Sequence, residues 1–257
     1  MILGCDVGTA SSKAVLMEGR SIRYFTSTPT QANPDQAMRR ILQDLRQQQQ
    51  LGPEDLEEIR ITGWGQDKVS LAHVGQPLMN CLGRAAVWAV PTCRSVLCLG
   101  CQQSVVLSVN PGGRVLEFRA NDKCAAGAGR FLEVISAALE IDAVRSSEVA
   151  GGADKELNMS SQCAVFAESE VVSLVNAGES VANIMSALLH ALSRSVATLA
   201  KRITPRPDCV VAGGLAGNET LVDYLQKRLK MRLKVFPPRP DLIAAVGAAL
   251  PAQGAQG

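Results

Sequence analysis

The feature that most constrains the fold is a pattern of three short apolar runs separated by turns, which occurs twice in the 257-residue chain. The first copy starts at the N-terminus and the second near Ser95, and the two share the order of elements but not the sequence. Each copy predicts a three-stranded meander. The expected strands are Met1–Val7, Lys13–Met17, Ile22–Phe25, Val96–Leu99, Val105–Val109 and Val115–Phe118.

The segments that follow each meander have the apolar spacing of helices. The expected helices are Asp35 to about Gln50, one ending near Ala89, Gly129–Leu139, Ala164–Asn176, Val181–Arg202, Asn218–Leu229 and Leu242–Leu250, with further strands at Glu58–Thr62, Asp208–Ala212 and Leu233–Phe236. This order predicts two α/β lobes. We expect residues 1–91, completed by the helix at about 241–250, to form one lobe. Residues 92–240 form the other, and residues 251–257 a disordered tail.

Charge and hydropathy exclude several classes of protein. The chain has 26 basic and 24 acidic residues, so it lacks the large basic field that holds a nucleic acid. No run of about 18 apolar residues and no signal peptide is found, so we expect no membrane partner and a cytoplasmic location. In that reducing compartment the eight cysteines are expected in metal, redox or core roles rather than in disulfides.

Small residues after the first strand indicate a phosphate-binding hairpin. Asp6 ends the strand, and Gly8, Thr9 and Ser11 allow a ligand to approach the backbone closely before Lys13 starts the next strand. The carboxylate of Asp6 could hold a hydrated Mg²⁺. The alternative is an ordinary hairpin with an aspartate beside its turn.

A second nucleotide signal is the pair Gly213-Gly214, which follows a short buried strand and precedes a helix. A nucleotide can lie flat on such backbone, although a tight strand-to-helix turn has the same sequence. The spacing of Asp6, a second hairpin from Cys98 and this Gly-Gly pair resembles the actin, hexokinase and Hsp70 superfamily. The resemblance implies a duplicated ribonuclease H-like fold with ATP or ADP and Mg²⁺ in a cleft between the lobes. It adds Gly100, Gln102 and Gly247 to the expected nucleotide-binding residues.

Two cysteines, Cys124 in NDKCAAGAGRF and Cys163 in SSQCAVFAESE, each stand shortly before an expected helix. A helix N-terminus favours a thiolate and therefore metal ligation. Because a 4Fe-4S cluster usually takes four thiolates, a two-fold dimer would supply the second pair. Buried inert thiols are the alternative, and we expect that state for Cys5, Cys81, Cys93 and Cys209.

These two segments resemble the activators of 2-hydroxyacyl-CoA dehydratases and the ATPase subunits of benzoyl-CoA reductase, the BadF/BadG/BcrA/BcrD ATPase family. The resemblance implies that Cys124 and Cys163 hold one 4Fe-4S cluster per dimer, formed with an identical or paralogous subunit. It also implies ATP-dependent delivery of low-potential electrons to an iron–sulfur dehydratase or reductase component. A ferredoxin or flavodoxin would supply those electrons.

The chain departs from this family at its second hairpin. Where the family usually has Asp-Ile-Gly-Gly-Gln-Asp, the chain has Cys98-Leu-Gly-Cys101-Gln-Gln103. Loss of both carboxylates should slow ATP hydrolysis severely, because they position water and metal. The family's Gly-Tyr-Gly-Arg is here Gly63-Trp-Gly-Gln66, and Leu78 and Leu82 replace a usual Glu and His.

Several functions remain open after these departures. The chain could be a slow ATPase, a nucleotide-gated electron carrier, or a weakened regulatory subunit beside an active paralogue. A small-metabolite kinase on the same fold is a further alternative, although positions 98 and 103 lack the carboxylate base that it would need. Cys98 and Cys101 are either an added metal or redox site or the result of drift to small apolar residues.

Overall fold

A computed structural model describes residues 1–121, 129–159 and 164–251. In the last of these ranges the side chains are described from residue 168 onward. The chain divides into two compact units, each made of segments distant in the sequence. The first is Met1–Arg94, Ser108–Leu116 and Phe236–Gly257, and the second is Ser95–Leu107 and Glu117–Val235. The predicted disordered tail lies outside the described residues from position 252 onward.

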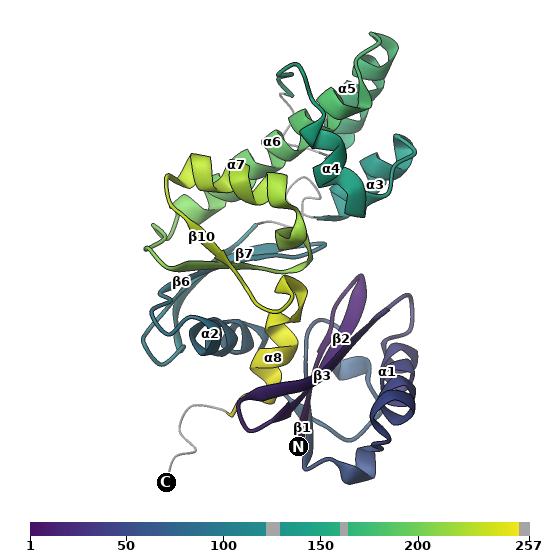
Figure 1. Cartoon of the computed structure of the whole chain (residues 1–257), viewed down its shortest axis with the longest axis vertical. Coiled ribbons are helices and arrows are strands. Elements are labelled where there is room, and N and C mark those ends of the chain that lie inside the picture. The colour runs from purple at the N-terminus through teal and green to yellow at the C-terminus, as the bar shows by residue number, and fades with distance from the viewer. Residues whose placement is uncertain (122–128, 160–163, 252–257) are drawn as a thin grey trace. The chain divides into compact units, whose positions relative to one another are not determined.

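The first sheet has five strands in the order β3-β2-β1-β4-β5 (Figure 1). Its strands are β1 Ile2–Val7, β2 Ser11–Glu18, β3 Ser21–Pro29, β4 Glu58–Thr62 and β5 Val74–Gly75. β1, β2 and β3 form the predicted antiparallel meander, and β4 pairs with β1 in parallel. β5 was not predicted, because two residues carry no periodic signal.

Helices α1 (Pro34–Gln49), α2 (Leu78–Ala89) and α8 (Ile243–Ala249) complete the first unit, with 3-10 turns at Pro53–Asp55, Gln66–Lys68 and Pro240–Leu242. The Asn33 side chain caps α1 by accepting a hydrogen bond from the Gln36 amide. Core residues of α1 recur at helical spacing and pack against the sheet: Met38, Ile41 and Leu45.

Helix α8 is the most deeply packed element of the first unit, since all seven of its residues are buried. It touches backbone on two sides. A Cβ on Gly247 would lie 1.9 Å from the Cys81 carbonyl oxygen in α2, and one on Gly4 would lie 2.2 Å from the Ala245 carbonyl oxygen. The Arg84 guanidinium donates to the Gly247 carbonyl at 2.9 Å. Glycine at both contacts therefore lets the last helix close this unit.

The second unit has a five-stranded sheet in the order β10-β9-β6-β7-β8, two of whose strands extend at one end into the first unit. The strands are β6 Ser95–Leu99, β7 Ser104–Val109, β8 Val115–Ala120, β9 Cys209–Ala212 and β10 Leu233–Val235. The predicted second meander and the two late strands are confirmed. β9 pairs in parallel with both β6 and β10.

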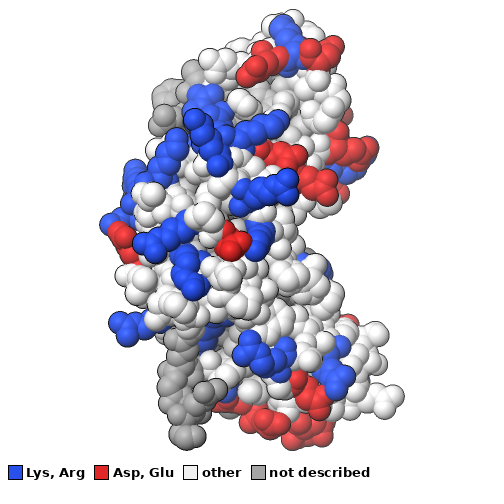
Figure 2. Space-filling model, turned by 60° about the vertical axis from the view of Figure 1, so that its left-hand side comes forward, with Lys and Arg blue, Asp and Glu red and all other residues white. Residues whose placement is uncertain are grey.

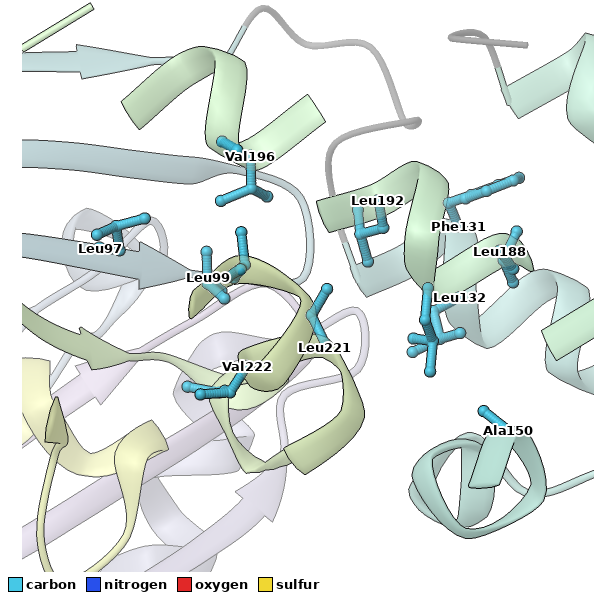
Figure 3. Close-up of a cluster of buried hydrophobic side chains, with 14 of the residues drawn as sticks. Leu97, Leu99, Phe131, Leu132, Ala150, Leu188, Leu192, Val196, Leu221 and Val222 are labelled. Carbon is cyan, nitrogen blue, oxygen red and sulfur yellow. The ribbon is translucent and has the colours of Figure 1, made fainter. Parts of the chain in front are cut away.

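The helices of the second unit are α3 Gly129–Ala138, α4 Ser146–Gly151, α5 Ala164–Asn176, α6 Val181–Lys201 and α7 Glu219–Leu229, with 3-10 turns at Ala143–Arg145 and Gly214–Gly217. Only α4 was not predicted, because six residues are too few for a periodic pattern. Side chains from several elements meet in one core (Figure 3): Leu97, Leu99, Phe131, Leu132, Leu188, Leu192, Val196 and Leu221. Among the described residues, no helix is long and apolar enough to cross a bilayer.

The packing of α8 generates a stability prediction. Gly247→Ala should lower the free energy of unfolding by about 2 kcal/mol or more, because the added methyl overlaps the Cys81 carbonyl and backbone must move. Gly151→Ala, where nothing lies within 4 Å of the added atom, is the matched control. Urea unfolding curves measure both, and equal midpoints would contradict this account of the contact.

Candidate functional site

The predicted first hairpin places a carboxylate and an ammonium side by side. Asp6 in β1 lies opposite Lys13 in β2, and the Lys13 Nζ atom is 3.4 Å from Asp6 Oδ2. Both side chains are 13% exposed. Lys13 also donates to the Ser11 carbonyl at 3.0 Å, which holds the ammonium over the turn. The pair is accessible enough to meet a ligand and buried enough to be held in place.

A buried hydroxyl pair fixes the turn itself. Thr30 donates through Oγ1 to the Gly8 carbonyl at 2.7 Å, and its amide donates to the Ala10 carbonyl at 3.0 Å. Ser12 Oγ lies 2.9 Å from Thr30 Oγ1, and both side chains are fully buried. Gly8, Thr9 and Ser11 remain partly exposed. Sequence reasoning missed Thr30, which is distant in the chain and carries no motif.

Gly63 is a further residue of this site, which the sequence analysis named only in the segment that replaces the family's Gly-Tyr-Gly-Arg. Its φ is +96°, and a Cβ there would lie 2.5 Å from Asp6 Oδ1 and 2.7 Å from the Val7 carbonyl oxygen. Glycine therefore allows the loop after β4 to pass directly against the carboxylate of Asp6. The next residue but one, Gly65, donates its amide to the Val7 carbonyl at 2.9 Å. The exposed side chain between them is Trp64.

Gly247 has a packing role in addition to the nucleotide role expected for it. It is buried against Cys81, and its carbonyl accepts from Arg84. That contact explains why glycine stands there, so nucleotide binding by Gly247 stays a prediction. Burial raises the pKa of the Cys81 thiol, and the neighbouring Arg84 charge offsets only part of the effect.

The cysteines expected to be inert are Cys5, Cys81, Cys93 and Cys209, and all four are buried. Burial also raises the pKa of the Cys5 thiol, with a smaller contribution from the nearby Asp6 carboxylate. A buried thiol with a raised pKa is a poor nucleophile and a poor metal ligand. Burial therefore argues against thiolate chemistry at Cys5 and Cys81.

The second hairpin joins β6 and β7 in the other unit. Gly100 donates to the Gln103 carbonyl at 3.0 Å to close the turn, and Gln102 is exposed. Helix α3 is attached to this turn, because the amides of Gly129 and Arg130 donate to the carbonyls of Gly100 (3.1 Å) and Cys101 (2.8 Å). These bonds satisfy amides of the first helical turn that have no partner inside the helix.

Helix α3 places a carboxylate beside the second hairpin, whose own sequence contains none. The Glu133 carboxylate lies close to Cys101 Sγ, with Oε1 at 3.8 Å and Oε2 at 3.9 Å. Arg130 forms an ion pair with Glu133 at 3.0 Å. Sequence spacing gives no signal for this contact, since the residues are 32 positions apart. Within residues 1–121, 129–159 and 164–251, no three His, Cys, Asp or Glu side chains gather as a metal site.

The Gly-Gly pair lies beside this hairpin. Cys98 in β6 is opposite Ala212 in β9, and the turn after β9 crosses the end of β6. Gly213 has φ +89°, and a Cβ there would lie 2.4 Å from the Leu99 carbonyl oxygen. Gly214 differs, because it is exposed and has nothing within 4 Å of an added Cβ. Backbone geometry therefore requires glycine at position 213. At position 214 a side chain would have room, and the glycine leaves the backbone exposed.

The predicted cluster ligands Cys124 and Cys163 lie outside the described residues. The helices that follow them in the sequence are described: α3 starts at Gly129 and α5 starts at Ala164, directly after Cys163. The first hairpin belongs to one unit, whereas the second hairpin and the Gly-Gly turn belong to the other. The expected cleft between the lobes stays a prediction.

The second unit also contains a cavity that no predicted site residue lines. It has a volume of about 490 Å³ between α4, α6 and α7. His190 faces it, and its Nδ1 lies 3.0 Å from the Arg228 guanidinium. Burial, followed by the Arg228 charge, lowers the pKa of His190, which favours the neutral imidazole. Ser186 also lines this cavity, and its hydroxyl lies 2.9 Å from that of Tyr224.

Comparison with known proteins decides the family. The sequence pattern of the BadF/BadG/BcrA/BcrD ATPase family matches residues 3–252. The chain belongs to this family. The resemblance predicted from the cysteine segments is therefore confirmed.

Two relatives align with the chain over nearly their whole length. The chain is 31% identical to the 2-hydroxyisocaproyl-CoA dehydratase activator of Clostridioides difficile, over 96% of this chain and 93% of that one. It is 30% identical to a benzoyl-CoA reductase subunit of Thauera aromatica, over 96% of this chain and 91% of that one.

Solved structures confirm the predicted fold class. The structure of the Clostridioides difficile activator with bound ADPNP superimposes with a TM-score of 0.92, covering 96% of this chain and 92% of that one. A ROK-family glucokinase from Streptomyces griseus, 14% identical over 96% of this chain and 97% of that one, superimposes with a TM-score of 0.57 and shares the fold alone. The duplicated actin- and hexokinase-like α/β fold is therefore confirmed.

The two glycines predict different responses to mutation. Gly214→Leu should weaken binding of the Mg²⁺ complex of ADPNP at least about tenfold, because its side chain would occupy exposed surface, while the unfolding midpoint stays unchanged. Gly213→Ala should lower the unfolding midpoint instead, owing to its positive φ and the contact with Leu99. Calorimetric titration and urea unfolding separate the two effects. Gly151→Leu, at another open position, is the control, and an unchanged affinity in Gly214→Leu would remove this turn from the nucleotide site.

Proposed function

We propose that the protein is an ATP-dependent electron-transfer activator, which holds one 4Fe-4S cluster across a homodimer and passes low-potential electrons to an iron–sulfur dehydratase or reductase acting on acyl-CoA substrates. The observation that carries the proposal is the match, over nearly the whole chain, to a dehydratase activator and to a subunit of benzoyl-CoA reductase. The NDKCAAGAGRF and SSQCAVFAESE segments support the same function.

The geometry of the first hairpin is suited to a nucleotide with Mg²⁺. Asp6 offers a partly exposed carboxylate of the kind that binds hydrated Mg²⁺, and the Lys13 ammonium, 3.4 Å from it, offers a cation to a phosphate. The carbonyls of Gly8 and Ala10 are already taken by Thr30, so the turn is held before any ligand arrives. On the other unit, exposed Gly214 offers a flat backbone surface to the adenosine.

For the cluster, the donors offered are Cys124 and Cys163 from each subunit. Thiolates are the usual ligands of 4Fe-4S clusters, and the bound cluster would supply one-electron transfer at low potential. The described helices fit this role, because α5 begins at Ala164, directly after Cys163, with an N-terminal partial positive charge. That end of the helix favours the thiolate form of a cysteine placed before it.

Hydrolysis is expected to be weak in this member of the family. Cys98 and Gln103 stand where carboxylates would orient water and metal, and the carboxylate that reaches the turn belongs to Glu133, which is paired with Arg130. A weakened regulatory subunit is therefore the second candidate function. A small-metabolite kinase is less well supported, because no carboxylate base lies in the hairpin.

The cluster assignment predicts iron content. Cys124→Ser and Cys163→Ser should each abolish iron binding, because each removes two of four ligands from the dimer. Cys93→Ser and Cys209→Ser, both at buried positions, are the controls and should retain full iron. The measurement is iron per dimer after anaerobic reconstitution, together with absorbance near about 400 nm. Equal iron in all four variants would refute the assignment.

The eroded hairpin predicts that ATP binding survives better than turnover. The triple change Cys98→Asp, Cys101→Gly and Gln103→Asp should raise the hydrolysis rate at least about tenfold, which corresponds to roughly 1.4 kcal/mol of barrier. Cys98 and Cys101 are partly exposed and Gln103 is exposed, so these positions can accept the polar residues. Phosphate release from ATP measures the rate. A flat rate in a correctly folded triple variant would overturn the role given to the lost carboxylates.

A further inference from the structure

A short stretch of the chain is far more basic than the rest. From Arg194 to Lys234 there are nine Lys and Arg residues against three Asp and Glu, whereas the whole chain has 26 against 24. This stretch therefore carries a formal charge of +6 in a chain whose net charge is +2. Neither the nucleotide site nor the cluster accounts for it.

The topology of the second unit brings these residues together. β9 and β10 are parallel, with Cys209 opposite Leu233 at their starts, and α6 and α7 each end just before one of these strands. Because parallel neighbours start at the same edge of a sheet, both helix-to-strand connections meet there. We call the resulting cluster the basic surface: Lys201, Arg202, Arg206, Lys227, Lys230, Arg232 and Lys234.

All seven side chains are exposed, and few are neutralised. Lys234 forms an ion pair with Asp208. Across the described part of the chain, the other six take part in no ion pair with a carboxylate: Lys201, Arg202, Arg206, Lys227, Lys230 and Arg232. In the view of Figure 2, basic side chains gather along one side with few acidic ones between them.

Two structural effects explain only part of this charge. Lys201 and Lys227 lie in the last turns of α6 and α7, where cations interact favourably with the helix dipole. Lys234 lies on β10, the edge strand, where a charge discourages pairing with other sheets. Arg202 and Lys230 are the C-cap residues of the same two helices, so the dipole effect extends to them. Neither effect applies to Arg206 and Arg232. Unpaired like charges close together repel, so their concentration favours an anionic partner.

We propose that the basic surface is the docking site for a small acidic electron-carrier protein that reduces the cluster. This identity of the occupant rests on the proposed function, which requires one protein that donates electrons and another that receives them. The donor must leave after each transfer, and transient redox encounters use small, charge-steered contacts. A surface rich in exposed, unpaired cations and poor in apolar anchors fits that kind of contact.

Two other anionic partners fit less well. Single-stranded nucleic acid is usually held by exposed aromatic side chains on which bases stack. The large exposed aromatics in the described residues are Trp64 and Phe118, and neither belongs to the basic surface. A membrane surface requires exposed apolar side chains among the cations, and Val235 is the large one adjacent to this surface in the described residues.

The test measures binding without turnover. An acidic oxidised ferredoxin is titrated into the full-length protein by calorimetry at low and at physiological salt. We expect the affinity to fall with salt, and the double variant Arg206→Glu/Arg232→Glu to bind at least about tenfold more weakly with a flatter salt dependence. Arg20→Glu/Arg114→Glu changes the net charge equally at exposed positions outside the basic surface and should leave the affinity unchanged.

Three outcomes would overturn the proposal. Equal losses in both double variants would reduce the effect to net charge, and an unchanged affinity in Arg206→Glu/Arg232→Glu would exclude the surface. Tighter binding of a DNA duplex or of phosphatidylserine vesicles, lost in the same variant, would assign the surface to another partner. Iron content of the unmodified protein is measured separately, so failure of the cluster assignment is distinguishable from failure of docking. Unfolding curves show that each variant is folded.

Discussion

The close contact of the last helix with the first strand is the constraint on which the first unit depends. All of α8 is buried, and it touches the backbone of β1 at Gly4 and that of α2 at Cys81. Residues separated by more than 200 positions therefore close one core, and β1 carries Asp6 at its end. Dense packing of this kind allows no side chain between the two backbones. The position of the first hairpin thus depends on the close packing of Gly4 and Gly247.

The two hairpins use the same architecture with different chemistry. The first keeps a carboxylate, a lysine and a turn fixed by the buried Ser12 and Thr30 hydroxyls. The second keeps its glycine turn and its attachment to α3, but it has thiol and amide side chains where carboxylates are expected. Backbone hydrogen bonds preserve its shape regardless of side chain. Binding geometry can therefore outlast catalytic chemistry in the same fold, since the two depend on different atoms.

The charged side chains near the first hairpin also differ from those of the basic surface. Near the first hairpin, individual ions are paired and partly buried, so each has a defined geometry. At the start of β9 and β10, exposed cations accumulate with few partners. Paired charges position a ligand, whereas an unpaired surface field mainly steers association and responds to salt. The contrast separates a site suited to a small ligand from a surface suited to a protein.

The sequence by itself determined most of the elements and the family. Apolar periodicity placed both meanders and the long helices, because those patterns extend over several residues, while α4 and β5 were too short to leave one. The motif residues Asp6, Lys13 and Gly213 were also apparent from the sequence. Only the tertiary structure decided that Gly63 lies against Asp6, that Thr30 fixes the first turn and that Glu133 reaches Cys101. Those contacts join segments distant in the chain, and spacing along a sequence carries no information about which distant backbones meet.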